Sequence, residues 1–343
     1  MRNETRVLFN AYLSNIATLN GVTDSSVKFT VSPTVQQTLE TKIQESSDFL
    51  TRINMVGVTE QEGEKLGLGI AGTIAGTTDT TATDRTPVDP LAMTKNVYSC
   101  KQTNFDTAIR YGTIDMWAKF KDFQTRLRDQ IVQRQALDRI MIGFNGTSRA
   151  ATSDRVAHPL LQDVNKGWLQ HVREDSPENW VKEIAAASGK VQIGPSVTTA
   201  NGFKTLDALV YDAVNNLIAP WYQEDTELVA ICGRGLLHDK YFPLLNKEQA
   251  PSEQMAADMI ISQKRIGGLQ AVRVPFFPAN AILITRLDNL SLYWQEGARR
   301  RNVIDNPKRD RVENYESSND AYVIEDYDGI ALIENIEIVE AVA

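Results

Sequence analysis

The spacing of apolar residues predicts a series of helices along the chain. Between residues 4 and 19 they recur every three or four positions, and Asn20-Gly21 ends the pattern. The longest pattern covers residues 113–142, which at 1.5 Å per residue predicts a rod of roughly 45 Å. Further helices are expected over residues 34–50, 177–187, 205–218, 236–245 and 252–263.

Short apolar or alternating runs predict the strands. These fall at residues 228–232, 271–274, 281–285, 290–294 and 321–339. Mixed with the helices, they describe a compact α+β or α/β domain. The N-terminal region has few large apolar residues, so we expect an arm that lies on something else.

Residues 59–96 predict a long, thin β-hairpin. Leu66, Leu68, Ile70 and Ile74 fall on one face of a strand pattern that glycines interrupt, and a Thr-rich stretch without bulky side chains follows. An isolated hairpin is only marginally stable in water. We therefore expect a neighbouring subunit to pack against these four apolar residues.

Composition and charge narrow the class of protein. The chain has 343 residues, of which 42% are hydrophobic and 23% charged, as in ordinary globular proteins. Apolar runs are too short for a membrane span, no secretory signal is visible, and Cys100 and Cys232 are expected to be reduced and buried. Nine acids and no Lys or Arg lie between residues 312 and 343, so without them the net charge of −8 becomes +1. This asymmetry has two equally weighted interpretations. The acidic segment either contacts a basic part of this chain or of another copy, or it forms a solvated acidic face.

Few residues could carry catalysis. Gly67-Leu-Gly69-Ile-Ala-Gly72 has the spacing of a phosphate-binding loop, but the sequence predicts no buried strand before it and no helix start after it. Glycines within a strand are therefore favoured over a nucleotide site. The three histidines lack metal-ligand spacing. His158 lies between Asp154 and Asp163, and a hydrolase built on these three residues is the alternative from another class. A structural role for these three polar residues in the loop is favoured over catalysis. No cofactor or metal is expected.

Two further segments suggest contacts with other chains. The stretch from residue 143 to 168 is too long for an ordinary connection and too apolar for disorder, and it lacks catalytic residues. Arginines and a lysine cluster at 299–301 and 308–311. They could contact phosphates, but ion pairing within or between subunits is favoured at a pI of about 5.1.

Long strings of the sequence resemble the major capsid proteins of tailed phages of the peduovirus type. The strongest block runs from Gly143-Phe-Asn-Gly146 to Leu161-Gln-Asp-Val-Asn-Lys-Gly-Trp-Leu-Gln170. Other blocks lie at residues 9–13, 45–54, 104–111, 239–243, 261–267, 272–278 and 311–317. The resemblance covers almost the whole chain and implies an α+β shell fold of the Hong Kong 97 (HK97) type.

That fold has four parts, which the resemblance places along the sequence. An N-terminal arm would be residues 1–56, and the extended loop, a β-hairpin, would be residues 57–97. A peripheral domain would comprise residues 98–184 and 306–343, with a spine helix at 113–142. An axial domain would be residues 185–305.

The resemblance also implies a function. Copies of the chain would form the hexamers and pentamers of an icosahedral virion shell around double-stranded DNA, which would lie on the inner face. Assembly would occur in the bacterial host cytoplasm with a scaffolding protein, a portal and a maturation protease, without a membrane or cofactor. A nanocompartment shell of the same fold is the alternative.

Candidate site residues follow from this assignment. The 143–168 loop would meet neighbouring capsomers near three-fold axes. The inter-subunit contact candidates are Arg149, Asp154, Arg155, Arg299, Arg300, Arg301, Arg309 and Arg311. A maturation cut is expected in the polar linker at Phe29, Thr30, Val31 and Ser32, which we expect to be exposed.

Overall fold

A computed structural model describes residues 1–70, 75, 77–82, 84–85, 91–117, 123–197, 202–237 and 264–339. Its helices are α1 (Asn3–Asn20), α2 (Pro33–Glu45), α3 (Asp48–Arg52), α4 (Tyr111–Trp117), α5 (Phe123–Asn145), α6 (Trp168–Asp175), α7 (Leu206–Leu217) and α8 (Pro220–Gln223). Within these described ranges, no helix is both long and apolar enough to cross a membrane.

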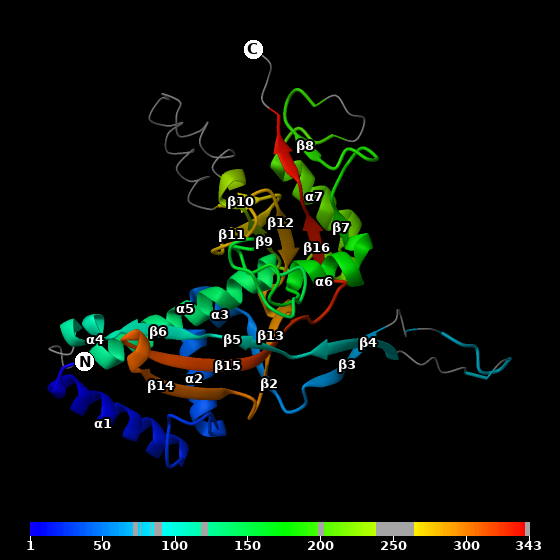
Figure 1. Cartoon of the computed structure of the whole chain (residues 1–343). Coiled ribbons are helices and arrows are strands. Elements are labelled where there is room, and N and C mark those ends of the chain that lie inside the picture. The colour runs from blue at the N-terminus through cyan, green and yellow to red at the C-terminus, as the bar shows by residue number, and fades with distance from the viewer. Residues whose placement is uncertain are drawn as a thin grey trace, which may run out of the picture.

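The strands form two large sheets. The first has the order β1-β14-β15-β13-β2, and β5 and β6 also pair with β15. Its strands are β1 (Phe29–Thr30), β2 (Asn54–Val58), β5 (Lys101–Asn104), β6 (Thr107–Arg110), β13 (Leu290–Gln295), β14 (Arg300–Asn306) and β15 (Arg311–Ile324). The long helix α5 lies across this sheet, and α1 runs along β14 (Figure 1).

The second sheet has the order β10-β11-β9-β12-β16-β7. Its strands are β7 (Trp180–Val181), β9 (Val229–Cys232), β10 (Arg265–Ile266), β11 (Leu269–Val272), β12 (Ile282–Thr285) and β16 (Ile330–Ile333). Alternate residues of β9, β12 and β16 contribute to two different apolar clusters, one of which includes α7. These strands are therefore apolar throughout because both of their faces are buried.

Two small pairs complete the structure. β8 (Val191–Ile193) pairs with β17 (Ile336–Ile338), and β3 (Glu62–Ile70) pairs with β4 (Leu91–Ser99). The β3–β4 hairpin leaves the first sheet at the opposite end from α4 and extends away from the body (Figure 1). Leu66, Leu68 and Ile70 fall within β3, whereas Ile74 lies outside the described residues.

The two sheets divide the C-terminal part of the chain at other points than the expected domain boundaries. β13 and β14 belong to the first sheet, although residues 185–305 were expected to form the axial domain. Conversely, β16 pairs with β12 and β17 with β8, although residues 306–343 were expected to be peripheral. The chain passes between the two sheets more often than the expected boundaries allow, because β13 to β15 of the first sheet lie between β12 and β16 of the second sheet in sequence.

Several predicted helices also differ from the structure. Residues 177–187 contain a short 3-10 turn at Pro177–Asn179 and the strand β7 instead of a helix. The predicted spine helix appears as α4 and α5, and residues 118–122 between them lie outside the described residues. The predicted helices at 236–245 and 252–263 fall largely on residues 238–263, which also lie outside.

The N-terminal arm lies on its own subunit. Phe9 and Ile16 of α1 pack with Phe29, Tyr111 and Val303 in a small apolar cluster. Farther along, Ile43, Phe49 and Leu50 join the large cluster beneath α5. The arm therefore shares the core of the chain, although it has few core residues of its own.

Candidate assembly surfaces and a buried ion-pair network

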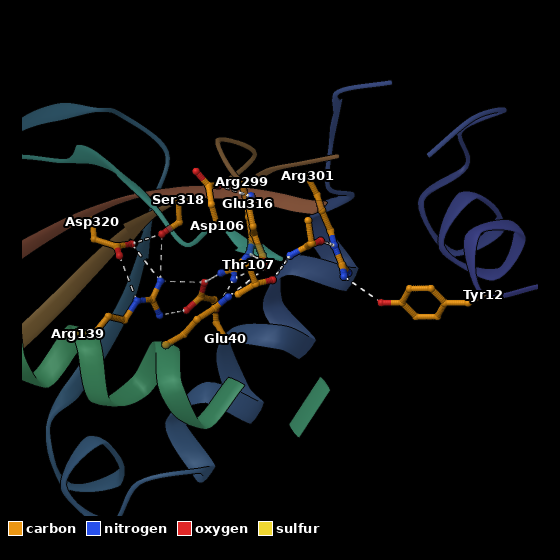
Figure 2. A network of polar contacts seen from close by, with 12 residues as sticks. Tyr12, Glu40, Asp106, Thr107, Arg139, Arg299, Arg301, Glu316, Ser318 and Asp320 are labelled. Carbon is orange, nitrogen blue, oxygen red and sulfur yellow. Dashed lines mark hydrogen bonds and ion pairs between the residues drawn. The ribbon is translucent and has the colours of Figure 1, made fainter. Parts of the chain in front are cut away.

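Two arginines and three acids form a buried network between α2, α5 and the first sheet (Figure 2). Arg139 Nε donates to Asp320 Oδ2 at 3.1 Å, and its terminal nitrogens donate to Glu40. Arg299 Nη1 donates to Glu40 Oε1 at 2.6 Å, and Arg299 Nε donates to Glu316 Oε1 at 2.8 Å. The five charged side chains are at most 5% exposed. Glu40 therefore joins both arginines, and through them α2 is tied to α5 and β15.

Neutral side chains complete the network. Gln135 donates to Glu316 Oε2 at 3.1 Å and accepts from Arg299 Nη2 at 2.7 Å. Ser318 Oγ donates to Asp320 Oδ1 at 2.8 Å. Because Glu316, Ser318 and Asp320 alternate along β15, all three point from one face of the sheet toward α5.

The carboxyl groups of the network respond differently to burial. Desolvation opposes ionisation of Glu40, yet Arg139 and Arg299 hold its pKa below the ordinary 4.5. Desolvation also opposes ionisation of Glu316, but Arg299 and Arg301 lower its pKa. For Asp320, desolvation outweighs Arg139 and the pKa is raised above the ordinary 3.8.

Arg299 is wrong as an inter-subunit contact candidate, because its side chain is fully buried among partners of its own chain. Arg311 also forms an ion pair within the chain, with Glu313 at 2.6 Å. Arg301 donates to Asn314 and to Tyr12 of α1. Arg300 and Arg309 are exposed, and among the described residues neither forms an ion pair. Part of the basic cluster thus pairs with the acidic C-terminal strands of the same chain. This is the ion pairing that the sequence favoured over contacts with phosphates.

The 143–168 loop has a rigid base where the two sheets meet. Trp168 is fully buried, and its Nε1 donates to the carbonyl of Ser291 in β13 at 2.9 Å. A Cβ added to Gly143 would lie 2.2 Å from Trp168 Cζ3, and one added to Gly167 would lie 2.3 Å from the Gly143 carbonyl oxygen. Glycine is therefore required at both positions by close packing.

The rest of this loop is held by its own hydrogen bonds and projects into solvent. The backbone N–H groups of Thr147 and Ser148 donate to the Gln162 carbonyl, and that of Asp154 donates to Asp163 Oδ2 at 2.7 Å. Asp154 Oδ1 accepts from Val156 N at 2.8 Å, and the Val156 side chain is 92% exposed. An ordered turn thus presents an apolar tip.

The three loop candidates differ in their contacts. Arg149 is exposed but donates to the Val164 carbonyl at 2.7 Å. The Asp154 carboxylate accepts hydrogen bonds from backbone N–H groups within the turn. Arg155 is exposed and forms no ion pair with the described residues. Desolvation raises the pKa of the half-buried Asp138, and the charges of Arg134 and, to a smaller extent, Arg155 oppose that rise. Arg155 is therefore the freest of the three for an external contact.

In the described part of the chain, no hydrogen bond joins the His158 imidazole to Asp154 or Asp163. His158 contacts Asp154 through the backbone, where its N–H donates to the Asp154 carbonyl at 2.8 Å. Asp163 faces Asp154 N instead of the imidazole. Across the described ranges, no group of three or more His, Cys, Asp or Glu side chains could hold a metal ion.

Among the described side chains, the contacts that anchor the hairpin lie at its base. Tyr98 packs edge-on against Tyr293 of β13, with ring centroids 5.1 Å apart. Glu62 accepts from Ser99 at 2.6 Å and from Lys101 at 3.2 Å. Cys100 is buried beside this base, and burial raises the pKa of its thiol to about 12, so it is held as an unreactive thiol.

The Phe29–Ser32 segment is not the exposed linker that the sequence suggested. Phe29 and Thr30 form β1, which pairs with Arg301 and Arg300 of β14. The side chains of Phe29 and Val31 are 8% and 3% exposed. A strand pairing and two buried apolar side chains therefore hold the predicted cleavage region against the first sheet.

Comparisons with known proteins agree with this architecture. The family described as phage major capsid protein, P2 family, matches residues 8–336. The chain is 55% identical to the capsid protein of Escherichia phage P2, over 98% of this chain and 96% of that protein. It is 40% identical to the major capsid protein of Serratia phage KSP20, over 98% and 97% of the two chains.

Solved structures show the same fold. One solved structure is the procapsid of satellite phage P4, which includes the size determination (Sid) protein. A chain of this procapsid superimposes on the present chain with a TM-score of 0.82 at 53% identity, and 99% of both chains is covered. The capsid of an empty GTA particle shares the fold at a TM-score of 0.53 and 13% identity, with 85% of this chain and 90% of that chain covered. The sequence, the two-sheet architecture and these matches agree that the chain belongs to the P2 family of phage major capsid proteins.

Proposed function

We propose that copies of this chain assemble as hexamers and pentamers into the icosahedral shell that encloses the double-stranded DNA of a tailed phage. The projecting β3–β4 hairpin is the observation that carries this proposal. Within the described part of the chain, β3 pairs only with β4, and the anchoring contacts lie at the base. A hairpin of this length needs support along its sides, which a neighbouring copy supplies in a shell.

Exposed charged and apolar groups at two other places support contacts between copies. Arg155 and the Val156 tip extend from the 143–168 loop. Arg300 and Arg309 are exposed on β14 and in the turn that follows it. We assign Arg155, Arg300 and Arg309 to contacts with neighbouring subunits, and Arg149 and Asp154 to holding the loop in shape.

The remaining partners follow from the proposed shell. A scaffolding protein would direct curvature, a portal would occupy one vertex, and a protease would cut near Phe29–Ser32. DNA would lie on the inner face, and the shell would form in the host cytoplasm before becoming part of the virion. Because β1 is paired with β14, we expect the protease to act only after β1 has left the sheet.

Shortening the hairpin tests the proposal. Glu64 and Val97 are register partners, so an Asn-Gly turn that replaces residues 65–96 would close the hairpin and keep its base. The variant should fold, with the same thermal unfolding midpoint within a few degrees, and should form no closed shells by electron microscopy. Normal shells from this variant would show that the hairpin is not an assembly element.

A further inference from the structure

The buried network contains more acids than bases. Its charged groups alternate in the order Asp320, Arg139, Glu40, Arg299 and Glu316. With every group ionised, three carboxylates and two guanidinium groups would give this series a net charge of −1, on side chains that are at most 5% exposed. An unpaired buried charge is unfavourable by several kcal/mol, and carboxyl groups in such places take up a proton.

The two ends of this series have different surroundings. Glu316 accepts hydrogen bonds from Arg299 and Gln135 and also experiences the charge of Arg301. Asp320 accepts from one arginine, Arg139, and from the neutral Ser318. The shortage of positive charge therefore falls at the Asp320 end.

The other groups near Asp320 do not make up the shortage. Glu40, on α2, repels it across Arg139. Cys100 and Tyr322 are close enough for their ionisation to be opposed by its charge, and the pKa values of both are raised, chiefly by burial. Lys101, the register partner on β5, is ion-paired with Glu62 at 3.2 Å.

We propose that Asp320 is a proton-binding site, whose carboxyl group holds one proton in the folded subunit at neutral pH. The proton comes from solvent on folding and brings the five-residue series to zero net charge. Ser318 Oγ lies 2.8 Å from Oδ1 and can accept a hydrogen bond from the protonated carboxyl, because a hydroxyl group both donates and accepts. Arg139 donates from Nε to Oδ2 and from Nη2 to Oδ1, each at 3.1 Å, and Nη2 also donates to Ser318 Oγ at 3.3 Å. The raised pKa of Asp320 agrees with this charge balance.

The site makes stability fall with rising pH. The folded pKa of Asp320 lies above its ordinary value of 3.8, so the folded state binds the proton more tightly than the unfolded state. The stabilisation is complete below the unfolded pKa and is lost as pH rises through the folded pKa. Relative to Asp320→Asn, the unfolding constant of the wild type should rise by up to about tenfold per pH unit within that window.

Infrared spectroscopy tests the site directly, in free subunits or assembled particles alike, and is therefore independent of the proposed shell. Protein labelled with ¹³C at the aspartate side-chain carboxyl should show one protonated carboxyl band per subunit at pH 7. The band should be absent in Asp320→Asn, and this variant should fold with little loss of stability because an amide replaces a neutral carboxyl of the same size. Glu316→Gln, which removes an ionised carboxylate from the other end, should lower the unfolding midpoint much more.

Each contrary result overturns the proposal. No protonated band in the wild type would mean that Asp320 is ionised, and a band that persists in Asp320→Asn would place the proton on another aspartate. Failure of Asp320→Asn to fold, or a loss of stability equal to that of Glu316→Gln, would show that the position needs a negative charge.

Discussion

At the scale of single residues, Glu40 is where the two buried arginines converge. Glu40→Gln would replace the carboxylate that pairs with both Arg139 and Arg299 by a neutral amide, so we expect a loss of about 3–5 kcal/mol in unfolding free energy. Denaturant unfolding of the subunit measures it. Glu45→Gln, an exposed position on the same helix, should change stability by no more than about 0.5 kcal/mol. Similar losses in both variants would contradict the assigned role of Glu40.

Gly143 makes a second prediction at this scale. In Gly143→Ala the new Cβ would overlap Trp168, whose ring also packs against Phe49, Phe144 and Tyr322. Overpacking should lower stability by about 1–3 kcal/mol. Gly112→Ala is the matched control, because a Cβ there meets nothing within 4 Å. Thermal unfolding of the two variants would refute the packing argument if Gly143→Ala were as stable as the control.

Arg155 tests the loop as a contact surface. Arg155→Glu should change the unfolding midpoint little, because the side chain is exposed and its charge has the smallest of the effects on Asp138, but should reduce the yield of closed particles severalfold. Arg155→Lys keeps the charge and should assemble nearly normally. Wild-type yields from Arg155→Glu in a quantitative sedimentation assay would show that the loop is only local structure.

At the scale of elements, β1 decides access to the predicted cleavage region. Val31→Asp would place a charge where the side chain is 3% exposed, so β1 should detach and a protease of broad specificity should cut between residues 29 and 32 several times faster. Val27→Asp, at a side chain 63% exposed, should leave the rate there unchanged. Mass spectrometry of timed digests measures both, and equal rates would mean that β1 pairing does not protect this region.

Some elements could be predicted from sequence because local signals were sufficient. The helix expected at 205–218 is α7, and its cap Thr205 accepts from Ala208 N at 3.2 Å. The buried strands at 228–232 and 281–285 are β9 and β12. The charged residues at 177–187 have a spacing typical of a helix surface, which is why a helix was predicted there. The segment instead contains β7, an edge strand that pairs with β16 about 150 residues away in sequence, and local sequence gives no sign of such a distant partner.

The network could not be predicted, because its members come from four distant segments. Within the predicted long helix, Gln133-Arg-Gln135 has only polar side chains and gives no sign of burial, although Gln135 and Arg139 lie one turn apart on a single buried face. The excess of acids at 312–343 did indicate that these residues would pair with basic side chains. Only the sheet register, which places β15 against β14 and under α5, identifies Glu316 and Asp320 as the buried acids.

At the scale of the whole molecule, three parts extend from a shared core. The second sheet rises on one side, the β3–β4 hairpin leaves one end of the first sheet, and α4 and the β14–β15 turn lie at the other end (Figure 1). Such a shape leaves much surface for neighbours. The buried network and Trp168 hold the parts together, so contacts made at the ends act on a rigid centre.

Electron microscopy of the full-length chain, produced with and without a candidate scaffolding protein, tests the central claim most directly. We predict closed icosahedral shells when the scaffold is present. Uniform monomers under every condition, with the subunit folded, would contradict the proposed function.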